Sequence, residues 1–367
     1  MEFKCNYEVF HPLGGASYVF EKDLIKYINH KTKKDKVIIS IGAQPNSSPH
    51  FGTLCVFSLA FSLAKKLKEY NSKKEISILF EVVDTAPSES LEINGIIYQI
   101  DLKGSIKMDN SMKDFKDILN YLSKKDKINY SIRNQSEFNS QKEIKEVIKR
   151  IIKKKKILEP LLDPKNEKLR IRSTCPKCGL VDKEGVKTVI GKEELVSFCP
   201  KHGEYRVNYQ KESNKLEYNT PLRNLIRGMA YGMINSSDEY DYEIIRVTGG
   251  DYAGFYQEEL LYKTAAICGF DVNKLPIILY CPQILDWSGA KLSKSLYVAK
   301  NAYVDLPKYL LNYQELYKEF KHKGLDYIHE ETDSWLDESY KLFRNYSAYY
   351  FIKVFEEKSK KKNGWYK

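Results

Sequence analysis

The stretch Val37-Ile38-Ile39-Ser40-Ile41-Gly42, followed by Pro49-His50-Phe51-Gly52-Thr53, decides the fold of this 367-residue chain. The first run is short, β-branched and closed by a glycine, which predicts a buried strand over residues 37–41. Residues 54–70 carry apolar side chains at helical spacing beside lysines, which predicts an amphipathic helix. A second strand is expected over residues 75–83. This order predicts an α/β fold, a doubly wound parallel sheet that binds ligands at the carboxyl ends of its strands.

Strand signals return late in the chain, over residues 243–247 and 276–280. A helical pattern over residues 256–268 separates them and stops before Gly269, which suits a helix end. These segments are expected to complete the parallel sheet.

Two further segments are predicted to be helical. Residues 141–156 form one basic amphipathic helix, whose lysines either coat a solvated face or track phosphates. Residues 306–367 are helical and rich in tyrosine, and they end in a lysine cluster.

Composition bounds the class of protein. An apolar fraction of 42% supports a real core, and no run approaches the twenty or so apolar residues of a membrane span. The N-terminus lacks the pattern of a secretory signal, which predicts a cytoplasmic protein. A net charge of +11 suits a polyanionic partner such as RNA, but its lysine excess also suits the codon usage of an AT-rich genome.

A cysteine-bearing module over residues 169–210 predicts a metal site. Cys175-Pro176-Lys177-Cys178 and Cys199-Pro200-Lys201-His202 are separated by 20 residues, and a glycine follows each pair. Three thiolates and one imidazole suit tetrahedral Zn²⁺ in a zinc-ribbon-like module. Because four protein ligands leave no open position, we expect a structural zinc ion rather than a catalytic one.

The first motif predicts a phosphate site. His50 and Gly52 lie where a strand turns into a helix, and free backbone N–H groups and the helix dipole favour anions there. Gly52 lets a nucleotide approach the backbone without a Cβ in the way. His50 is positioned to donate a hydrogen bond to a phosphate oxygen during attack at the α-phosphorus.

A second motif, Lys291-Leu292-Ser293-Lys294-Ser295, predicts a site for the leaving pyrophosphate. Its two lysines supply cations, and Gly289 before them allows a loop to fold over the phosphates. The catalytic candidates are therefore His50, Lys291 and Lys294.

Together the two motifs resemble the nucleotide-handling signatures of class I aminoacyl-tRNA synthetases, written HIGH and KMSKS, with Thr53 where the second histidine stands. The resemblance implies a Rossmann-like catalytic domain that uses ATP with Mg²⁺. The residues expected at ATP are Gly42, His50, Gly52, Thr53, Gly249, Asp251, Lys291, Ser293, Lys294 and Ser295.

A narrower resemblance is to the archaeal-type class I lysyl-tRNA synthetases. Residues 46–52 resemble their SSxPHxGH opening, the metal module is similar, and Gly249-Gly250-Asp251-Tyr252 resembles their GKDH segment. The Lys and His of GKDH are replaced, and their tryptophan-rich segment has no counterpart in residues 218–223. Only 72 residues follow the second motif, so the sequence resembles a truncated member without the anticodon-binding domain.

Substrate selection is expected to fall to Glu243, Asp251, Tyr252 and Tyr256. A carboxylate facing the pocket would hold the amino group of the substrate, and an aromatic ring would cover its side chain.

The predicted activity is ATP-dependent formation of an aminoacyl-adenylate and transfer of the acyl group to an acceptor, with tRNA the acceptor that the resemblance implies. One alternative is a biosynthetic ligase that uses a small molecule or carrier protein as acceptor, and another is a non-catalytic RNA-binding paralogue. Four parts are expected: 1–168 and 219–305 as the two halves of the catalytic domain, 169–218 as the zinc-binding insertion, and 306–367 as a helical C-terminal segment.

Overall fold

The computed structural model of the chain describes residues 24–85, 87–292 and 303–361. Ser293, Lys294 and Ser295 of the second motif lie outside the described residues.

A five-stranded parallel sheet forms the centre of the molecule, in the order β13-β12-β1-β2-β5. Its strands are β1 (Lys36–Ala43), β2 (Glu75–Val82), β5 (Asn129–Asn134), β12 (Tyr242–Gly249) and β13 (Ile278–Cys281). The chain starts in the middle at β1, runs outward to β5, and returns to the other side of β1 with β12. The strand order therefore reverses between β1 and β12, the position where open α/β sheets bind ligands.

The sheet is covered on both faces, which is why β1 is almost uniformly apolar. Val37, Ile39 and Ile41 pack into one cluster with α2 (Phe51–Tyr70), whereas Ile38 faces a second cluster with α7 (Thr220–Asn235). The strand and helix predictions for this region are confirmed.

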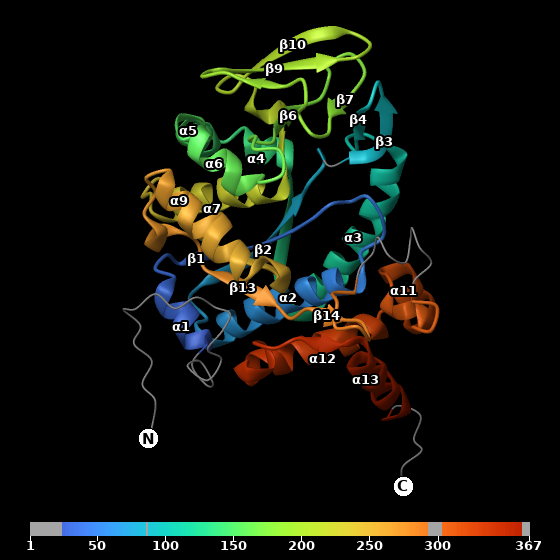
Figure 1. Cartoon of the computed structure of the whole chain (residues 1–367). Coiled ribbons are helices and arrows are strands. Elements are labelled where there is room, and N and C mark those ends of the chain that lie inside the picture. The colour runs from blue at the N-terminus through green and yellow to red at the C-terminus, as the bar shows by residue number, and fades with distance from the viewer. Residues whose placement is uncertain (1–23, 86, 293–302, 362–367) are drawn as a thin grey trace.

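One face of the sheet carries α1, α2 and α3, and the other carries the helices from α4 to α9 (Figure 1). The helices are α1 (Leu24–Lys31), α3 (Ile106–Asp126), α4 (Gln135–Asn139), α5 (Lys142–Lys153), α6 (Lys155–Leu162), α8 (Phe255–Gln257) and α9 (Lys263–Ile267). A π-helical turn, Glu258–Tyr262, joins α8 to α9, so the helix predicted over residues 256–268 is confirmed with this irregularity.

The prediction of one continuous helix over residues 141–156 is wrong. The helix ends at Lys153 and a second begins at Lys155, because the N–H of Lys154 bonds the carbonyl of Ile151 three residues back. The break falls inside the run of four lysines, where like charges on adjacent turns repel one another.

Small antiparallel sheets cap one end of the molecule (Figure 1). Asn94 and Gly95, both with positive φ, join β3 (Pro87–Ile93) to β4 (Ile96–Asp101) in the two-residue hairpin turn that such residues favour. The cysteine module and the segment directly after it supply the remaining strands of these small sheets. They are β6 (Ile171–Ser173), β7 (Leu180–Asp182), β8 (Val189–Ile190), β9 (Glu194–Cys199), β10 (Gly203–Asn208) and β11 (Leu216–Tyr218).

The C-terminal helices pack on the face of the sheet that carries α2 and α3, on the side away from the cysteine module (Figure 1). They are α11 (Tyr313–Phe320), α12 (Lys323–Asp337) and α13 (Ala348–Lys361), which confirms the helical prediction over the described part of this segment. A short parallel pair, β14 (Ile284–Leu285) with β15 (Tyr346–Ser347), ties the segment to the region after the central sheet.

Short 3₁₀ turns complete the described chain, at Ser213–Lys215, Gly250–Tyr252, Val272–Lys274, Lys308–Leu310 and Ser339–Lys341. Within the described ranges no helix combines the length and apolar character needed to span a membrane.

Candidate functional site

A cavity of about 880 Å³ opens at the carboxyl ends of β1 and β12, where the strand order reverses. Four regions line it: the loop from β1 to α2, the start of α7, the turn after β12, and the segment from Pro282 to Leu292. Both sequence motifs therefore reach one cavity, although they lie about 240 residues apart in the chain.

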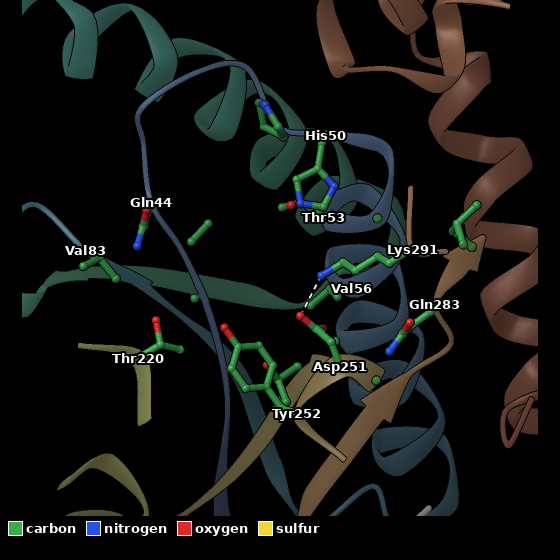
Figure 2. A pocket seen from close by; sticks show the side chains of 18 of the residues that line it. Gln44, His50, Thr53, Val56, Val83, Thr220, Asp251, Tyr252, Gln283 and Lys291 are labelled. Atoms are coloured by element: carbon green, nitrogen blue, oxygen red, sulfur yellow. Dashed lines mark hydrogen bonds and ion pairs between the residues drawn. The ribbon is translucent and has the colours of Figure 1, made fainter. Parts of the chain in front are cut away.

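The first motif forms the entry to α2. His50 precedes the helix with extended backbone, and its carbonyl accepts hydrogen bonds from the N–H groups of Thr53 and Leu54. A Cβ on Gly52 would stand 3.1 Å from Cε1 of the His50 ring, so glycine allows the imidazole to lie over the first turn. Figure 2 shows His50 and Thr53 on the same side of the cavity. This end of the cavity therefore offers a helix start and an imidazole to an anion.

Lys291 reaches the cavity from the second motif and meets the turn after β12. Its Nζ donates to Oδ2 of Asp251 at 2.6 Å, the interaction drawn in Figure 2. Gly249 permits this arrangement, because its Cβ would fall 2.5 Å from Oδ1 of Asp251. Gly250 is needed for a different reason: its Cβ would stand 2.9 Å from the backbone oxygen of Cys281.

The loop that presents Lys291 is held by Asp286. This carboxylate accepts hydrogen bonds from the backbone of Ser288 and Ala290 and from the hydroxyl of Tyr303. Burial opposes the charged form, but these hydrogen bonds prevail and hold the pKa of Asp286 below its usual value. Gly289 has φ +79°, as a tight loop requires, and Lys291 pairs with Leu285 across it.

The other sequence-predicted residues divide between the cavity and elsewhere. Gly42 and Tyr252 line the cavity together with Asp251. Tyr256 stands behind Tyr252, with ring centroids 5.3 Å apart, and does not line the cavity. Burial chiefly, with the charges of Tyr252 and Asp251, raises the pKa of Tyr256 to about 12.

Glu243 lies at the amino-terminal end of β12, whereas the cavity lies at the carboxyl end. It is the second residue of β12, and its Oε1 accepts hydrogen bonds from the backbone N–H groups of Lys33 and Lys34 at 2.9 and 3.2 Å. The carboxylate closes the turn before β1, so Glu243 does not belong to the candidate site.

The cavity is also lined by three arginines that were not predicted from the sequence. They are Arg223 and Arg227 of α7, and Arg246 of β12. Arg223 forms a buried ion pair with Glu217. Arg227 donates to Oε1 of Gln135 at 2.8 Å, and Arg246 donates to Oδ1 of Asn224 at 2.9 Å. A charged residue inside the apolar run of residues 244–247 is the signal that would have found Arg246.

The cysteine module gathers its four predicted ligands into one cluster. The Sγ atoms of Cys175, Cys178 and Cys199 and a ring nitrogen of His202 all lie within 4.8 Å of one another. Cys175 and Cys199 are 3.5 and 3.6 Å from Nδ1 of His202, and Cys178 is 3.5 Å from Cys199. Donors around one tetrahedral Zn²⁺ lie roughly 3.5–3.8 Å apart, so the cluster could hold such an ion.

Tight turns present these ligands. Gly179 and Gly203 both adopt positive φ, +72° and +77°, directly after the two ligand pairs. The buried apolar cluster of the module consists of Tyr98, Cys175, Leu180 and Cys199, so two of its four members are predicted ligands. A core this small needs a cross-link to be stable.

No family model matches the chain, and no curated protein matches it. Among solved structures, it is similar to a Campylobacter jejuni protein assigned as an arginyl-tRNA synthetase, at 13% identity and a TM-score of 0.34, over 85% of this chain and 68% of that one. A glutamate–tRNA synthetase from Elizabethkingia anophelis gives 12% identity and a TM-score of 0.36, over 72% of this chain. A glutamate–tRNA ligase from Elizabethkingia meningosepticum gives 13% and 0.32, also over 72%. The chain spans about half the length of these two glutamate enzymes, 54% and 53%.

Proposed function

We propose that this chain is a ligase that uses ATP to activate an amino acid as its adenylate and then passes the acyl group to an acceptor. The observation that carries the proposal is the convergence of the two motifs. His50 and the start of α2 meet Lys291 and Asp251 in one cavity at the switch point of the sheet. Imidazole, free helix N–H groups and an ammonium group are the donors that a triphosphate requires.

In the proposed first step a carboxylate oxygen of the amino acid attacks the α-phosphorus of ATP. The bond from that phosphorus to the bridging oxygen breaks, and pyrophosphate leaves with the bond electrons. His50 donates a hydrogen bond to the phosphoryl oxygens as negative charge grows on them. Lys291, with Lys294 expected beside it, stabilises the leaving pyrophosphate. Mg²⁺ bound to ATP would neutralise part of the phosphate charge.

Asp251 has two functions in this proposal. In the described conformation it neutralises Lys291, and both side chains are about 40% exposed, so phosphates can displace the carboxylate at little cost. Once released, Asp251 is free to accept a hydrogen bond from the ribose or from the amino group of the substrate. Tyr252 covers the cavity beside it.

In the second step a nucleophile on the acceptor attacks the acyl carbon, and AMP leaves. The resemblance of the two motifs favours the 3′ hydroxyl of a tRNA as that nucleophile. The same cavity would serve an amine of a small molecule or carrier protein equally well, and this acceptor is the second candidate.

The Cys/His cluster is proposed to hold a structural Zn²⁺. Its four ligands complete a tetrahedral shell, so a metal there would cross-link β7, β9 and β10 rather than act on substrate. We propose the four-part division at residues 168, 218 and 305 on the same basis, with the metal-binding part inserted between α6 and α7.

Amino-acid-dependent ATP–pyrophosphate exchange tests the proposed first step. We expect exchange with at least one amino acid, and a loss on the order of 100-fold in His50→Ala or Lys291→Ala, because each removes a donor to developing charge. Lys263→Ala is the matched control, since Lys263 is an exposed lysine paired with Glu259 outside the cavity. The absence of exchange with every amino acid would refute the proposal.

The acceptor is tested separately. The chain is incubated with the activated amino acid, ATP and total tRNA, and acylated RNA is separated and counted. Exchange together with acylated RNA supports the tRNA acceptor, whereas exchange without it supports the biosynthetic ligase.

A further inference from the structure

The cavity has an excess of positive charge on its α7 side. Arg223 is accounted for, since Glu217 pairs with it and the carbonyl of Tyr218 accepts from it at 2.7 Å. Arg227 and Arg246, unlike Arg223, have no carboxylate partner among the described residues. Within the parts of the chain that the structure describes, no carboxylate lies within ion-pair distance of either guanidinium.

The carboxylate of Glu81, which lies near Arg227, already has other partners. Glu81, which is 1% exposed, forms an ion pair with Arg133 and accepts a hydrogen bond from Tyr231. Glu81 thus neutralises Arg133, and Arg227 lies beside this pair, because a Cβ on Gly42 would stand 3.6 Å from both the Arg227 Nη1 and the Glu81 Cβ. Arg227 is 4% exposed, and its Nε has no hydrogen-bond partner in the described structure.

Such an arrangement is costly in an empty protein. A buried charge without a counter-ion destabilises the fold, so an anionic ligand that supplies the missing charge would stabilise it on binding. Burial, and secondarily the charge of Arg227, lowers the pKa of Arg246 to about 10, which is the direction expected for a cation held away from water beside a like charge. An anion placed between them would remove that cost.

The two arginines lie in a different part of the cavity from the phosphate-binding end. Arg246 shares a face of β12 with Ile244, which packs against α7, whereas α2 covers the other face. Arg227 lies beside the end of β1, because a Cβ on Gly42 would stand 3.6 Å from its Nη1. In Figure 2, Tyr252 and Thr220, the first residue of α7, lie across the cavity from His50. A ligand with its phosphates at His50 and Lys291 would therefore leave the arginines to a second anionic group.

We propose that the amino acid activated at this site has an acidic side chain, glutamate or aspartate, whose carboxylate is held by Arg246 and Arg227. The inference rests on the proposed function and specifies its substrate. A planar carboxylate accepts paired hydrogen bonds from guanidinium groups, which fixes its orientation as well as its charge. The ring of Tyr252, 5.9 Å from the guanidinium carbon of Arg246, closes this side. The same charges exclude lysine, whose ammonium group would be repelled.

Calorimetry on the full-length chain tests the proposal, with glutamate, aspartate, glutamine, asparagine and lysine as probes. We expect one acidic amino acid to bind at least about 100-fold more tightly than its amide, because the amide leaves the guanidinium charges unpaired. Arg246→Gln should abolish that preference, and Arg246→Lys should restore part of it. Pyrophosphate exchange with the same amino acids should follow the same order.

Thermal unfolding of the ligand-free variants separates recognition from folding. Arg246→Gln removes an uncompensated charge and should leave the melting temperature unchanged or higher. Arg133→Gln is the matched control from the same cluster, and it should lower the melting temperature by several degrees because it leaves Glu81 buried without a partner.

The possible failures can be told apart. Exchange with a neutral or basic amino acid, and none with glutamate or aspartate, would overturn the acidic substrate and leave the proposed function standing. An acidic amino acid that binds through Arg246 but supports no exchange would uphold the recognition and refute the activation step. An Arg246→Gln chain that keeps its affinity for glutamate, or that loses affinity for ATP instead, would overturn the assignment of the arginines.

Discussion

At the scale of single residues, alanine substitutions of the two adjacent glycines at the end of β12 should affect stability and activity in opposite ways. Gly249 has φ −67°, which any residue adopts, and only the Asp251 carboxylate stands in the way of a Cβ. In Gly249→Ala that carboxylate must rotate away from Lys291. We expect stability to stay within about 0.5 kcal/mol, because the displaced ion pair is exposed. Pyrophosphate exchange should fall on the order of 10-fold, because the displaced carboxylate no longer accepts a hydrogen bond from the ribose or the substrate amino group.

Gly250→Ala, in contrast, should lower the stability of the fold. Its Cβ would meet the backbone oxygen of Cys281, which cannot rotate away, so the turn and the end of β13 must shift. We expect a loss of about 1–3 kcal/mol in the free energy of unfolding, measured with urea. Equal stability of the two variants would show that the turn is less tightly packed than this contact implies.

The sequence predicted the place of residues whose types have few functions, such as paired cysteines. It did not predict the place of residues whose types have many functions, such as arginine. The Cys/His cluster and its glycine turns follow from spacing alone, because few other patterns need those residues together. Arg227 and Arg246 gave no comparable signal, since most arginines lie on the surface and only the packing of α7 against β12 makes these two unusual. Glu243 was misplaced for a different reason. It stands at the start of its strand, and the rule that ligands bind at the carboxyl ends of parallel strands already excludes that position.

At the scale of elements, the cysteine module should depend on its metal. Cys178→Ser removes one of four ligands, and we expect loss of bound zinc, measured by metal analysis, and unfolding of β7 to β10, measured by hydrogen exchange. Cys268→Ser is the control, since Cys268 is a buried cysteine of the second core cluster, away from the module. A Cys178→Ser chain that retains one equivalent of zinc would refute the assignment of the ligands.

The contact between α2 and α12 contains a buried polar junction. His329, which is 1% exposed, bonds Ser62 at 3.2 Å and Asp126 at 3.0 Å, and Thr332 completes the cluster at 2.9 Å from Ser62. His329→Leu would leave Asp126 buried and unpaired, so we expect a loss of about 3 kcal/mol in the free energy of unfolding. Asp337→Ala on the same helix breaks only an exposed pair with Lys66 and should leave that quantity unchanged. Equal stability of the two variants would show that this buried polar cluster does not stabilise the fold.

Elements with one strong local pattern were predicted well, and elements that depend on contacts elsewhere were not. The apolar runs of β1 and α2 suffice to define them, because each is buried on almost every side. The Asn94-Gly95 turn carried a hairpin signal that was overlooked. The division between α5 and α6 was missed because the apolar periodicity continues through it, and the run of four lysines at the break was the one local feature against a continuous helix.

At the scale of the whole molecule, the C-terminal segment, residues 306–361, contacts the regions of both sequence motifs. The N–H of Tyr313 bonds the carbonyl of Pro49, and the backbone of Asn312 pairs with that of His50. The N–H of Tyr346 bonds the carbonyl of Gln283, which begins the segment leading to Lys291. These contacts join residues tens to hundreds of positions apart, so no local pattern could have predicted them. The convergence of the motifs is thus a property of the complete fold.

Phe351 allows this bracing to be tested. It is fully buried in α13, and its ring lies edge-on to that of Phe51, the residue between His50 and Gly52, with centroids 4.9 Å apart. Phe351→Ala should lower the free energy of unfolding by about 3–5 kcal/mol through the cavity it leaves. Because α2 begins on this contact, we also expect weaker binding of ATP, measured by calorimetry at a temperature where the variant is folded. Tyr349→Ala, two residues away and 53% exposed, is the control and should change neither quantity. A folded Phe351→Ala chain that binds ATP with unchanged affinity would show that the C-terminal segment stabilises the fold without shaping the nucleotide site.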